Sequence, residues 1–576
     1  MSNVFLSGLD SGYHLTSNTI TYAFSDAYFA WNAYEEAQFR AALEQWSNVA
    51  NINFVETANE AQADFRLFNV DDSIIGAGIL ADFEYPWGGQ QYGRFNYEGL
   101  GWDDPNVTGG LEQGGYGYST ILHEVGHGLG LAHPHDASGT STIYPGVSSP
   151  WDTGNYGYNQ GLYTVMGYND GRVADGLDPY TIENYGWSGG PMAFDIFAIQ
   201  RIYGANRNYN TGDDTYTLPE VNDTGTFYQA IWDAGGFDTI AYGGSAATNI
   251  DLRTATLRYG DPHAGGYLST AAGIYGGFTI AAGVRIEAAS GGSGNDRIIG
   301  NNARNVIDGN DGDDVIKGLN GHDLLRGGAG ADVIIGGYGS DTIEGGDDDD
   351  RLYGQIGNDR IETGDGLNIA DGGVGHDRII GGIDADKIYG GAGRDALIGG
   401  DGNDMIWGGD DNDVLVGGSG NDRLIGQRGV NRMYGEDGDD VLVGGNERDR
   451  LIGGNDNDRL VGRAGDDILI GGDGDDTLIG GPGRDIYYGG AGNDTYAFSN
   501  GYRDMAVIQD GWGADSILGF ADGEDLLNMR QVSGLTTFNQ LTITADGGDT
   551  VITFGADSIR LVDVNASLIT DDDILI

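Results

Sequence analysis

Residues 291–308 read GGSGNDRII and GNNARNVID, two consecutive copies of the nine-residue unit that decides the fold of the second half of the chain. Counting in nines from Asp296 reaches Asp494 after 23 positions without an insertion, and 20 of these positions are Asp and three are Asn. Two residues after each of them, the side chain is Ile or Leu at 19 of the 23 positions. A disordered Gly/Asp spacer has no reason to keep apolar residues in phase with Asp, so the pattern indicates a folded repeat.

The unit has the form G-G-x-G-x-D-x-U-x, in which U is apolar. The Gly-rich hexad makes a turn that gathers backbone carbonyls and a carboxylate around a hard cation, and the x-U-x triplet is a very short strand whose apolar residue points inward. Two units complete one coil, so stacking aligns the turns on each flank. We therefore predict an all-β, right-handed parallel β-roll over residues 291–494, holding roughly 20 calcium ions between neighbouring turns.

Some turns depart from this pattern, and we expect the calcium sites beside them to bind weakly or to stay empty. Three turns have lost the carboxylate of the sixth position, and five have an acidic residue in place of the fourth-position glycine. The substituted positions are Asn305, Asn368 and Asn431 for the first group, and Asp348, Asp384, Asp411, Glu447 and Asp456 for the second.

The charge balance agrees with a cation-binding protein. The chain has 88 acidic and 29 basic residues, a formal net charge of −59. This charge excludes nucleic acid as a natural partner, because phosphate would be repelled. Twenty dications would carry about +40 and offset most of it. The chain has no cysteine, so it cannot form disulfides. Cross-links that stabilise the fold must instead come from metal ions bound by oxygen ligands.

The length of 576 residues favours several structural units over one core. We expect a mixed α and β part at 1–205, a connector at 206–290, the repeat array at 291–494 and a β cap at 495–576. No stretch approaches the eighteen apolar residues of a membrane span. The N-terminus has neither a basic region nor an apolar core, so it does not resemble a Sec-type signal peptide.

Upstream of the repeats, residues 121–133 read ILHEVGHGLGLAH. On a helix, His123 and His127 lie one above the other on one face and can share a metal ion. Gly130 lets the chain leave the helix through a conformation that a side chain would resist, and His133 then supplies a third nitrogen. Three protein ligands leave a fourth position open, which is typical of a catalytic zinc site.

The first 205 residues have a mixed α and β pattern. Apolar residues at helical spacing predict an amphipathic helix at 34–49, and Ser119 is expected to cap the start of the zinc-binding helix. Short strands are expected at 52–55, 65–70 and 76–83, and in the connector at 232–240 and 278–286.

Together these motifs resemble the serralysins, bacterial metzincin zinc endopeptidases that carry RTX calcium-binding repeats. Residues 163–168 (YTVMGY) are similar to the family's Met-turn, with Met166 beneath the metal. Residues 194–204 resemble the helix that closes the family's catalytic domain. The resemblance implies an α+β metzincin domain followed by the β-roll.

The same resemblance implies one zinc ion on His123, His127 and His133, with Tyr168 as a further ligand that can leave the metal. Glu124 would be the general base that activates the zinc-bound water. The implied activity is that of a secreted, calcium-stabilised zinc endopeptidase that hydrolyses extracellular proteins. A catalytically degenerate protein that uses a calcium-stiffened rod to bind a surface or matrix is the alternative.

His135 departs from the family pattern, in which glycine is usual at this place. It could compete for the metal, but a solvated loop histidine is expected.

The resemblance also implies calcium ligands, some of them backbone carbonyls. In the connector these are Asn210, Gly212, Asp214, Asp233, Gly235, Gly236, Asp238, Arg285 and Glu287. In the repeats the implied ligands are Gly292, Gly294, Asp296, Asn301, Ala303, Asn305, Asn310, Gly312, Asp314, Gly321, Asp323, Gly328, Gly330, Asp332, Gly337, Gly339, Asp341, Gly346, Asp350, Asp359, Asp377, Asp386, Gly391, Gly393, Asp395, Gly400, Gly402, Asp404, Asp413, Gly418, Gly420, Asp422, Asp440, Asp449, Asp458, Asp467, Gly472, Gly474, Asp476, Asp485 and Asp494.

The C-terminal segments 496–498, 517–520 and 571–576 resemble the end of proteins exported by ABC-type (type I) secretion, whose signal is C-terminal. A structural role for the acidic-then-apolar terminus is an equal alternative on sequence alone. The resemblance implies a secreted, extracellular monomer that meets the ABC-type secretion machinery and protein or peptide substrates.

Overall fold

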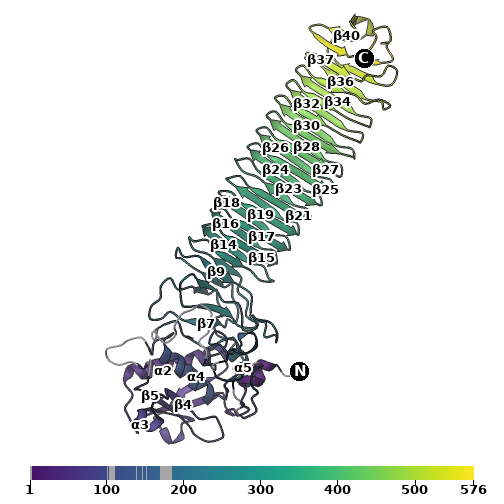
Figure 1. Cartoon of the computed structure of the whole chain (residues 1–576). Helices are drawn as coiled ribbons and strands as arrows, with labels where there is room; N and C mark the ends of the chain where they lie inside the picture. Colours follow the sequence, from purple (N-terminus) through teal and green to yellow (C-terminus); the bar gives the residue numbers. More distant parts are fainter. Residues whose placement is uncertain are drawn as a thin grey trace. The chain divides into compact units, whose positions relative to one another are not determined.

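The computed structural model describes residues 3–99, 102, 110–135, 137, 139–145, 147–150, 152–168 and 185–576. The chain forms two compact units, residues 1–302 and 303–576 (Figure 1). None of the described helices combines the length and the hydropathy that crossing a bilayer requires.

A five-stranded sheet forms the scaffold of the N-terminal part of the first unit. Its strand order is β2-β1-β3-β5-β4, and all neighbours are parallel except the edge strand β4, which runs antiparallel to β5. The strands are β1 Thr19–Ser25, β2 Asn53–Glu56, β3 Phe65–Val70, β4 Ala81–Phe83 and β5 Gln91–Asn96.

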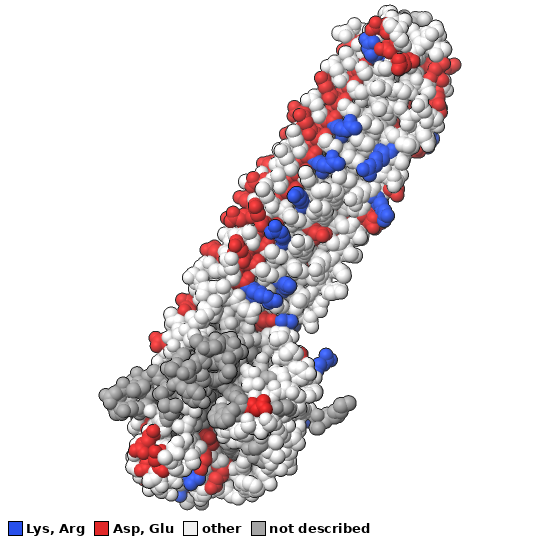
Figure 2. Space-filling model, viewed as in Figure 1, with Lys and Arg blue, Asp and Glu red and all other residues white. Residues whose placement is uncertain are grey.

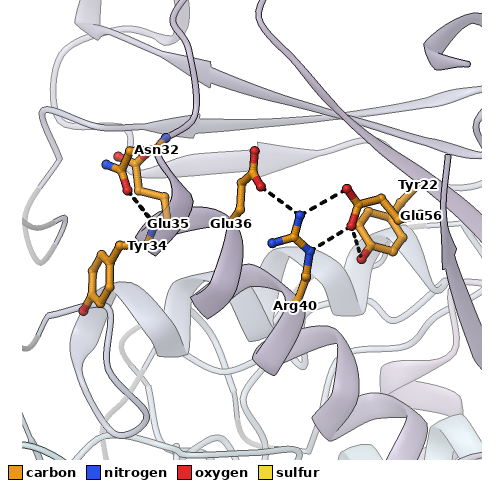
Figure 3. Close-up of polar contacts among 7 residues, drawn as sticks. All are labelled: Tyr22, Asn32, Tyr34, Glu35, Glu36, Arg40 and Glu56. Atoms are coloured by element: carbon orange, nitrogen blue, oxygen red, sulfur yellow. Dashed lines mark hydrogen bonds and ion pairs between the residues drawn. The ribbon is translucent and has the colours of Figure 1, made fainter. Parts of the chain in front are cut away.

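Helix α2, Ala33–Val49, confirms the predicted amphipathic helix. Its start is fixed by a capping box, in which the Asn32 side chain accepts the Glu35 N–H and the Glu35 carboxylate accepts the Asn32 N–H, both at 2.9 Å (Figure 3). Arg40 Nε donates to Glu56 Oε2 at 2.8 Å, which ties the helix to β2. These contacts orient the helix against the sheet.

Three further helices carry the remaining core of this part: α1 Val4–Leu9, α4 Tyr116–Gly128 and α5 Ala193–Tyr203. The rings of Phe5 and Phe194 stack with centroids 4.2 Å apart, which joins α1 to α5. Short helical turns occur at α3 Asp72–Ile75, η1 Glu60–Gln62 and η2 Asn155–Gly157.

The predicted cap of the zinc-binding helix is wrong. Helix α4 begins at Tyr116, and its N-cap is Gly115, which makes no side-chain hydrogen bond there. Ser119 therefore lies inside the first turn and not at its boundary. Glycine is tolerated at an N-cap because it adopts the extended conformation there, although it has no side chain to accept a hydrogen bond. Serine is usually preferred at this position, and for that reason Ser119 was predicted.

The strand predicted at 76–83 is only partly correct. Gly76 and Gly78 take positive φ values of 105° and 81°, so the chain turns after α3 and enters the sheet only at β4.

The connector pairs short strands in parallel: β6 with β8, β8 with β12, β7 with β11, and β9 with β13, while β10 lies antiparallel to β9. The strands predicted at 232–240 and 278–286 are shorter and shifted, because glycines at 235 and 236 with φ of 137° and 153° break the first one. The strands are β6 Thr215–Thr217, β7 Tyr228–Ile231, β8 Thr239–Ala241, β9 Thr248–Asp251, β10 Thr270–Ala271, β11 Gly277–Ile280, β12 Ala288–Ser290 and β13 Arg297–Ile299.

In the second unit, alternate strands form two parallel ladders with an eighteen-residue register, as in the pairing of Val315 with Val333 (Figure 1). The repeat strands are β14 Val306–Asp311, β15 Val315–Asn320, β16 Leu324–Ala329, β17 Val333–Tyr338, β18 Thr342–Asp347, β19 Arg351–Ile356, β20 Arg360–Gly364, β21 Ile369–Val374, β22 Arg378–Ile380, β23 Lys387–Ala392, β24 Ala396–Asp401, β25 Met405–Asp410, β26 Val414–Ser419, β27 Arg423–Gln427, β28 Arg432–Asp437, β29 Val441–Gly445, β30 Arg450–Asn455, β31 Arg459–Val461, β32 Ile468–Asp473, β33 Thr477–Ile479, β34 Ile486–Ala491 and β35 Thr495–Ala497.

The remaining strands close the unit. Strands β36 to β38 and β42 extend the parallel pairing, whereas β39, β40 and β41 form antiparallel hairpins. Their bounds are β36 Met505–Gln509, β37 Ala514–Leu518, β38 Leu526–Gln531, β39 Thr542–Asp546, β40 Asp549–Phe554, β41 Asp557–Leu561 and β42 Ile574–Leu575, with a 3-10 turn at Phe538–Gln540.

The core of this unit is a column of apolar side chains, one from each x-U-x triplet. Ile307, Leu325, Ile343 and the equivalent residues of the following coils are completely buried. Even the exceptions to the Ile/Leu rule, such as Met433, point into the column. The predicted fold class, an α+β metzincin-type domain followed by an all-β parallel roll, is confirmed.

Candidate metal centres

Three histidine side chains converge at the end of α4. The helix places His123 and His127 on one face, as predicted. At Gly130, where the chain turns away from the helix, φ is 101°, which is the left-handed conformation that was expected there. His133 then brings its Nε2 atom to 3.0 Å from the Nε2 atoms of both other histidines. A tetrahedral zinc ion with bonds of about 2.0–2.1 Å holds its ligand nitrogens about 3.3 Å apart, so the cluster fits one zinc ion.

The outer ring nitrogens fix the orientation of two of these imidazoles. His123 Nδ1 lies 2.8 Å from the carbonyl oxygen of Val165, and His127 Nδ1 lies 2.8 Å from that of Leu131. Protonation at Nδ1 leaves each Nε2 with a lone pair for a metal. Burial, together with the neighbouring His127, lowers the pKa of His123 to about 3, so the ring is neutral.

The predicted Met-turn lies directly beneath the helix. A Cβ on Gly126 would overlap the sulfur of Met166, so the thioether packs on the helix backbone. The buried carboxylate of Asp195 holds the turn by accepting the Thr164 hydroxyl at 2.5 Å and the Val165 N–H at 2.7 Å. Burial raises the pKa of Asp195 to about 7, although these hydrogen bonds lower it. No motif or spacing in the sequence distinguishes Asp195 from the other residues of helix α5.

Tyr168 reaches the same cluster. Its hydroxyl lies 3.0 Å from His133 Nε2, its ring stacks against His123 with centroids 5.4 Å apart, and 45% of its surface is exposed. The structure therefore brings together all four residues that the resemblance assigned to zinc.

His135 lies in a turn, as expected of a loop residue, but its side chain is not solvated as expected. Its ring stacks on His133 with centroids 4.6 Å apart and lies 5.0 Å from the ring of Tyr168, so the imidazole is half-buried. Stacking on His133, with the Tyr168 ring nearby, removes part of the imidazole surface from water.

Glu124 is buried at the wall of a cavity of about 390 Å³ that His123 also lines. Burial and the negative charge of Asp82 raise the pKa of Glu124 to about 8, while a hydrogen bond from the Phe83 backbone lowers it. The other walls are mostly apolar or aromatic and come from segments far apart in the sequence. They include Leu80, Ala81, Thr120, Leu162, Val165, Trp187 and Tyr228.

The predicted connector ligands form one cluster. Carboxylate oxygens of Asp214, Asp233 and Asp238 lie within 4.8 Å of one another. Glu287 joins them by accepting the Asp238 N–H at 3.0 Å, and it also pairs with Arg285. Burial, with the nearby charges of Asp233 and Glu287, raises the pKa of Asp238 to about 6. Buried carboxylates this close are unfavourable without a cation, so the donor set fits calcium.

Other predicted ligands of the connector lie beside the same carboxylates. The backbone of Gly236 lies against the carbonyl oxygen of Gly212, and a Cβ there would overlap it. Gly235 donates its N–H to Asp233 Oδ1 at 2.8 Å, and Asn210 reaches the cluster through the hydroxyl of Tyr216.

In the repeats, the sixth-position aspartates form two ladders along the roll. In each, Oδ1 accepts the backbone N–H of the equivalent residue eighteen positions earlier, for example Asp332 N–H to Asp350 Oδ1 at 2.8 Å. The other oxygen, Oδ2, is buried and has no protein donor among the described residues at most positions, which is the arrangement a bound cation would satisfy. These positions are Asp323, Asp332, Asp341, Asp350, Asp359, Asp377, Asp395, Asp404, Asp413, Asp422, Asp440, Asp458, Asp467, Asp476, Asp485 and Asp494.

Family models match two segments of the chain. The model described as Matrixin matches residues 14–153, which include the three histidines. The model of the RTX calcium-binding nonapeptide repeat (4 copies) matches nine overlapping segments between residues 290 and 496. The chain combines a matrixin-type domain with RTX repeats. These matches imply catalytic zinc and many structural calcium ions, so the predicted cofactors are confirmed.

Curated relatives extend the likeness, and the predicted resemblance to serralysins is confirmed. Metallopeptidase AprA of Pseudomonas marginalis is 33% identical over 294 residues, which cover 48% of this chain and 56% of that protein. The serralysins of Photorhabdus luminescens and Proteus mirabilis are 33% and 32% identical over 48% of this chain, covering 54% and 56% of their own lengths. The chain thus spans about half the length of the curated relatives it matches.

The RTX ladders continue beyond the last unit of the nine-residue period. Asp504, Asp515 and Asp525 accept the N–H groups of Asp485, Asp494 and Asp504 at 2.9 to 3.0 Å, at spacings of 19, 21 and 21 residues. A strict count in nines misses them. The signal that could have found them is an aspartate followed two residues later by an apolar residue, which all three positions keep.

Proposed function

We propose that the chain is a zinc endopeptidase that works outside the cell and needs calcium to fold its roll. One observation carries the proposal: the Nε2 atom of His133 lies 3.0 Å from those of His123 and His127, beside a buried glutamate at the wall of a cavity. The matrixin match and the serralysin relatives support the same reaction class.

The residues divide the chemistry among them. When bound by the three histidines, zinc supplies Lewis acidity that polarises a carbonyl group and lowers the pKa of water. The carboxylate of Glu124 takes a proton from the attacking water and passes it to the departing amine. The hydroxyl of Tyr168 donates a hydrogen bond to the oxygen that becomes negative in the transition state.

The cavity and the nearby sheet edge provide a place for a peptide. Strand β4 is the last strand of the sheet order, and its first residue, Ala81, and the preceding Leu80 line the cavity. An extended peptide can pair with such an edge through its backbone, while the apolar walls around Leu162 and Trp187 accept a side chain beside the cleaved bond. We infer a preference for an apolar or aromatic residue at that position.

Export and calcium belong to the same proposal. Extracellular modules bind calcium at about 10⁻⁴ to 10⁻³ M, far above cytosolic levels, so the roll would stay unfolded inside the cell and fold outside it. The C-terminal segments that resemble type I secretion signals support export of a monomer through an ABC-type machinery.

A protease assay separates this proposal from the alternative of a degenerate surface- or matrix-binding protein. Casein is incubated with the full chain in millimolar calcium, with and without a zinc-selective chelator, and zinc is then restored. We expect hydrolysis that stops with the chelator and returns with zinc. A zinc-loaded chain that leaves casein intact would support the binding protein instead.

A further inference from the structure

Two turns of the roll satisfy their aspartate oxygens with the protein's own hydrogen bonds. Asp386 Oδ2 accepts the Gly382 N–H at 3.0 Å and the Thr363 hydroxyl at 3.2 Å. Asp449 Oδ2 accepts the Gly445 N–H at 2.5 Å. In the other repeat turns discussed above, the same oxygen is buried without a protein donor among the described residues.

The backbone of these two turns differs from that of the others. In the turn that ends at Asp404, the second and fourth residues, Gly400 and Gly402, have φ values of 117° and 126°. Gly382 and Gly445, the second residues of the two unusual turns, are not in this left-handed region. Their N–H groups instead point at the carboxylate of their own turn, where other turns offer a place for a cation.

The turn one coil earlier carries asparagine in both cases. Asn368 Nδ2 donates to the carbonyl oxygen of Gly366 at 3.0 Å, and Asn431 Nδ2 donates to that of Gly429 at 3.2 Å. These are fourth-position carbonyls of the kind expected to bind calcium. An amide N–H therefore occupies the side of the carbonyl that a cation would use.

An acidic residue completes each pair. Asp384 Oδ2 accepts the Gly366 N–H, and Glu447 Oε2 accepts the Gly429 N–H, both at 3.1 Å. The two pairs share one sequence rule, an asparagine at the sixth position and an acid at a fourth position sixteen residues later. Other acidic fourth positions, such as Asp411 with a φ of 81°, keep the left-handed turn.

The same closed form occurs at the ends of the ladders. In the first unit, Asp296 Oδ2 accepts the Gly292 N–H at 2.7 Å. In the second unit, Asp504 and Asp525 Oδ2 accept backbone N–H groups at 2.9 and 2.8 Å, after the last repeat. A turn closed by a backbone N–H thus also occurs at the start of one ladder and at the end of the other, while Asp515, at the end of the first ladder, accepts the Tyr496 hydroxyl at 3.2 Å.

We propose that the turn pairs Asn368/Asp386 and Asn431/Asp449 are hydrogen-bonded joints that hold no calcium and divide the calcium ladders of the roll into shorter runs. The Oδ1 ladder passes through them unbroken, so strand pairing continues while the cation sites are interrupted. Asp386 and Asp449, expected from the sequence to be calcium ligands, then act as structural acceptors. The proposal depends on calcium in the other turns and not on peptidase activity.

Counting calcium in two matched variants tests the proposal. Asp386→Asn and Asp404→Asn change equivalent positions one coil apart, and native mass spectrometry of the full chain in saturating calcium resolves single bound ions. We expect Asp404→Asn to lose at least one ion and Asp386→Asn to keep the wild-type number. An equal loss in both variants would overturn the proposal.

A second experiment looks for a gain of bound calcium. Its outcome cannot be explained by a variant that has lost calcium because it fails to fold. Asn368→Asp combined with Asp384→Gly restores the sixth- and fourth-position residues of the repeat at the first joint, while Thr363 keeps its place at the first position. We expect this variant to bind at least one more ion than the wild type. The control is Asn403→Asp, which adds a carboxylate at an exposed fifth position, as Asn368→Asp does at the sixth, and should leave the number unchanged. If the double variant binds no more calcium than the wild type, the proposal that these turn pairs are calcium-free joints is contradicted.

Discussion

At the scale of single residues, the zinc cluster is built by hydrogen bonds from outside it. The carbonyl of Val165 orients His123, and Asp195 in turn holds the peptide of Val165. Gly126, within the helix, leaves room for the Met166 side chain that packs on it. These contacts fix the ring positions in the chain itself, so the metal does not have to collect its ligands from a mobile loop.

Tyr168→Phe tests the role of the phenol. The substitution keeps the ring that stacks on His123 but removes the hydroxyl that lies 3.0 Å from His133. We expect a loss of about 10²-fold in kcat with unchanged zinc content, because one donor to the transition-state oxygen is missing. Tyr156→Phe, at another exposed tyrosine, is the control and should retain wild-type kcat. Equal kcat in both variants would remove Tyr168 from the mechanism.

Asp195 gives a pH prediction. Its pKa is raised from 3.8 to about 7 in the folded state, so between about pH 4 and 7 the folded chain holds a proton that the unfolded chain has released. Stability from this group therefore falls as pH rises through that window, by on the order of 4 kcal/mol.

Asparagine does not titrate, so the free energy of unfolding of the wild type, minus that of Asp195→Asn, should decrease from pH 4 to pH 7. Urea unfolding followed by tryptophan fluorescence measures this difference at each pH. A difference that stays constant with pH would show that Asp195 is ionised throughout.

At the scale of elements, the strands of the roll depend on one buried side chain each. In β26, Leu415 is completely buried whereas Val414, next to it, is 36% exposed. Inward and outward residues alternate along each triplet. Neighbouring positions on one strand therefore contribute unequally to the free energy of unfolding.

Leu415→Ala should lower the free energy of unfolding of the roll by about 2–5 kcal/mol, since it leaves a cavity in the central column. Val414→Ala, on the same strand, should cost less than about 1 kcal/mol. Thermal unfolding at fixed calcium compares the two. Similar losses would contradict the unequal burial of the two side chains, and a larger loss for Val414→Ala would mean that the strand faces the opposite way.

The elements that could be predicted from sequence are those with a period. Helix α2 and the strands of the roll follow from regular apolar spacing, and the three histidines follow from a motif that lies within one helix and its exit. The cap at Gly115 and the connector strands lacked such a signal, because glycine conformations decided them. The cavity beside Glu124 could not be predicted either, since its walls come from segments as distant as residues 80 and 228.

At the scale of the whole molecule, charge is the dominant constraint. The net charge is −59, and Figure 2 shows acidic side chains gathered along an edge of the repeat unit, with Lys and Arg on the adjoining face. Self-repulsion of this size opposes a compact roll unless cations bind to the folded state. Calcium then contributes to folding in addition to filling a site.

Removing calcium should therefore unfold the roll. We expect circular dichroism to show a β-rich spectrum in millimolar calcium and its loss on addition of a calcium chelator, with recovery when calcium is returned. The midpoint of recovery should lie near 10⁻⁴ to 10⁻³ M free calcium. A β-rich spectrum that persists in chelator would mean that the ladders close without cations.

The most direct measurement compares casein hydrolysis by the wild-type chain and by Glu124→Gln, with the zinc content of each determined by elemental analysis. Glutamine fills the same space beside His123 but cannot accept the proton. We predict that the variant retains stoichiometric zinc and loses about 10²- to 10⁴-fold of kcat/KM. A zinc-loaded variant that cleaves casein at the wild-type rate would contradict the mechanism.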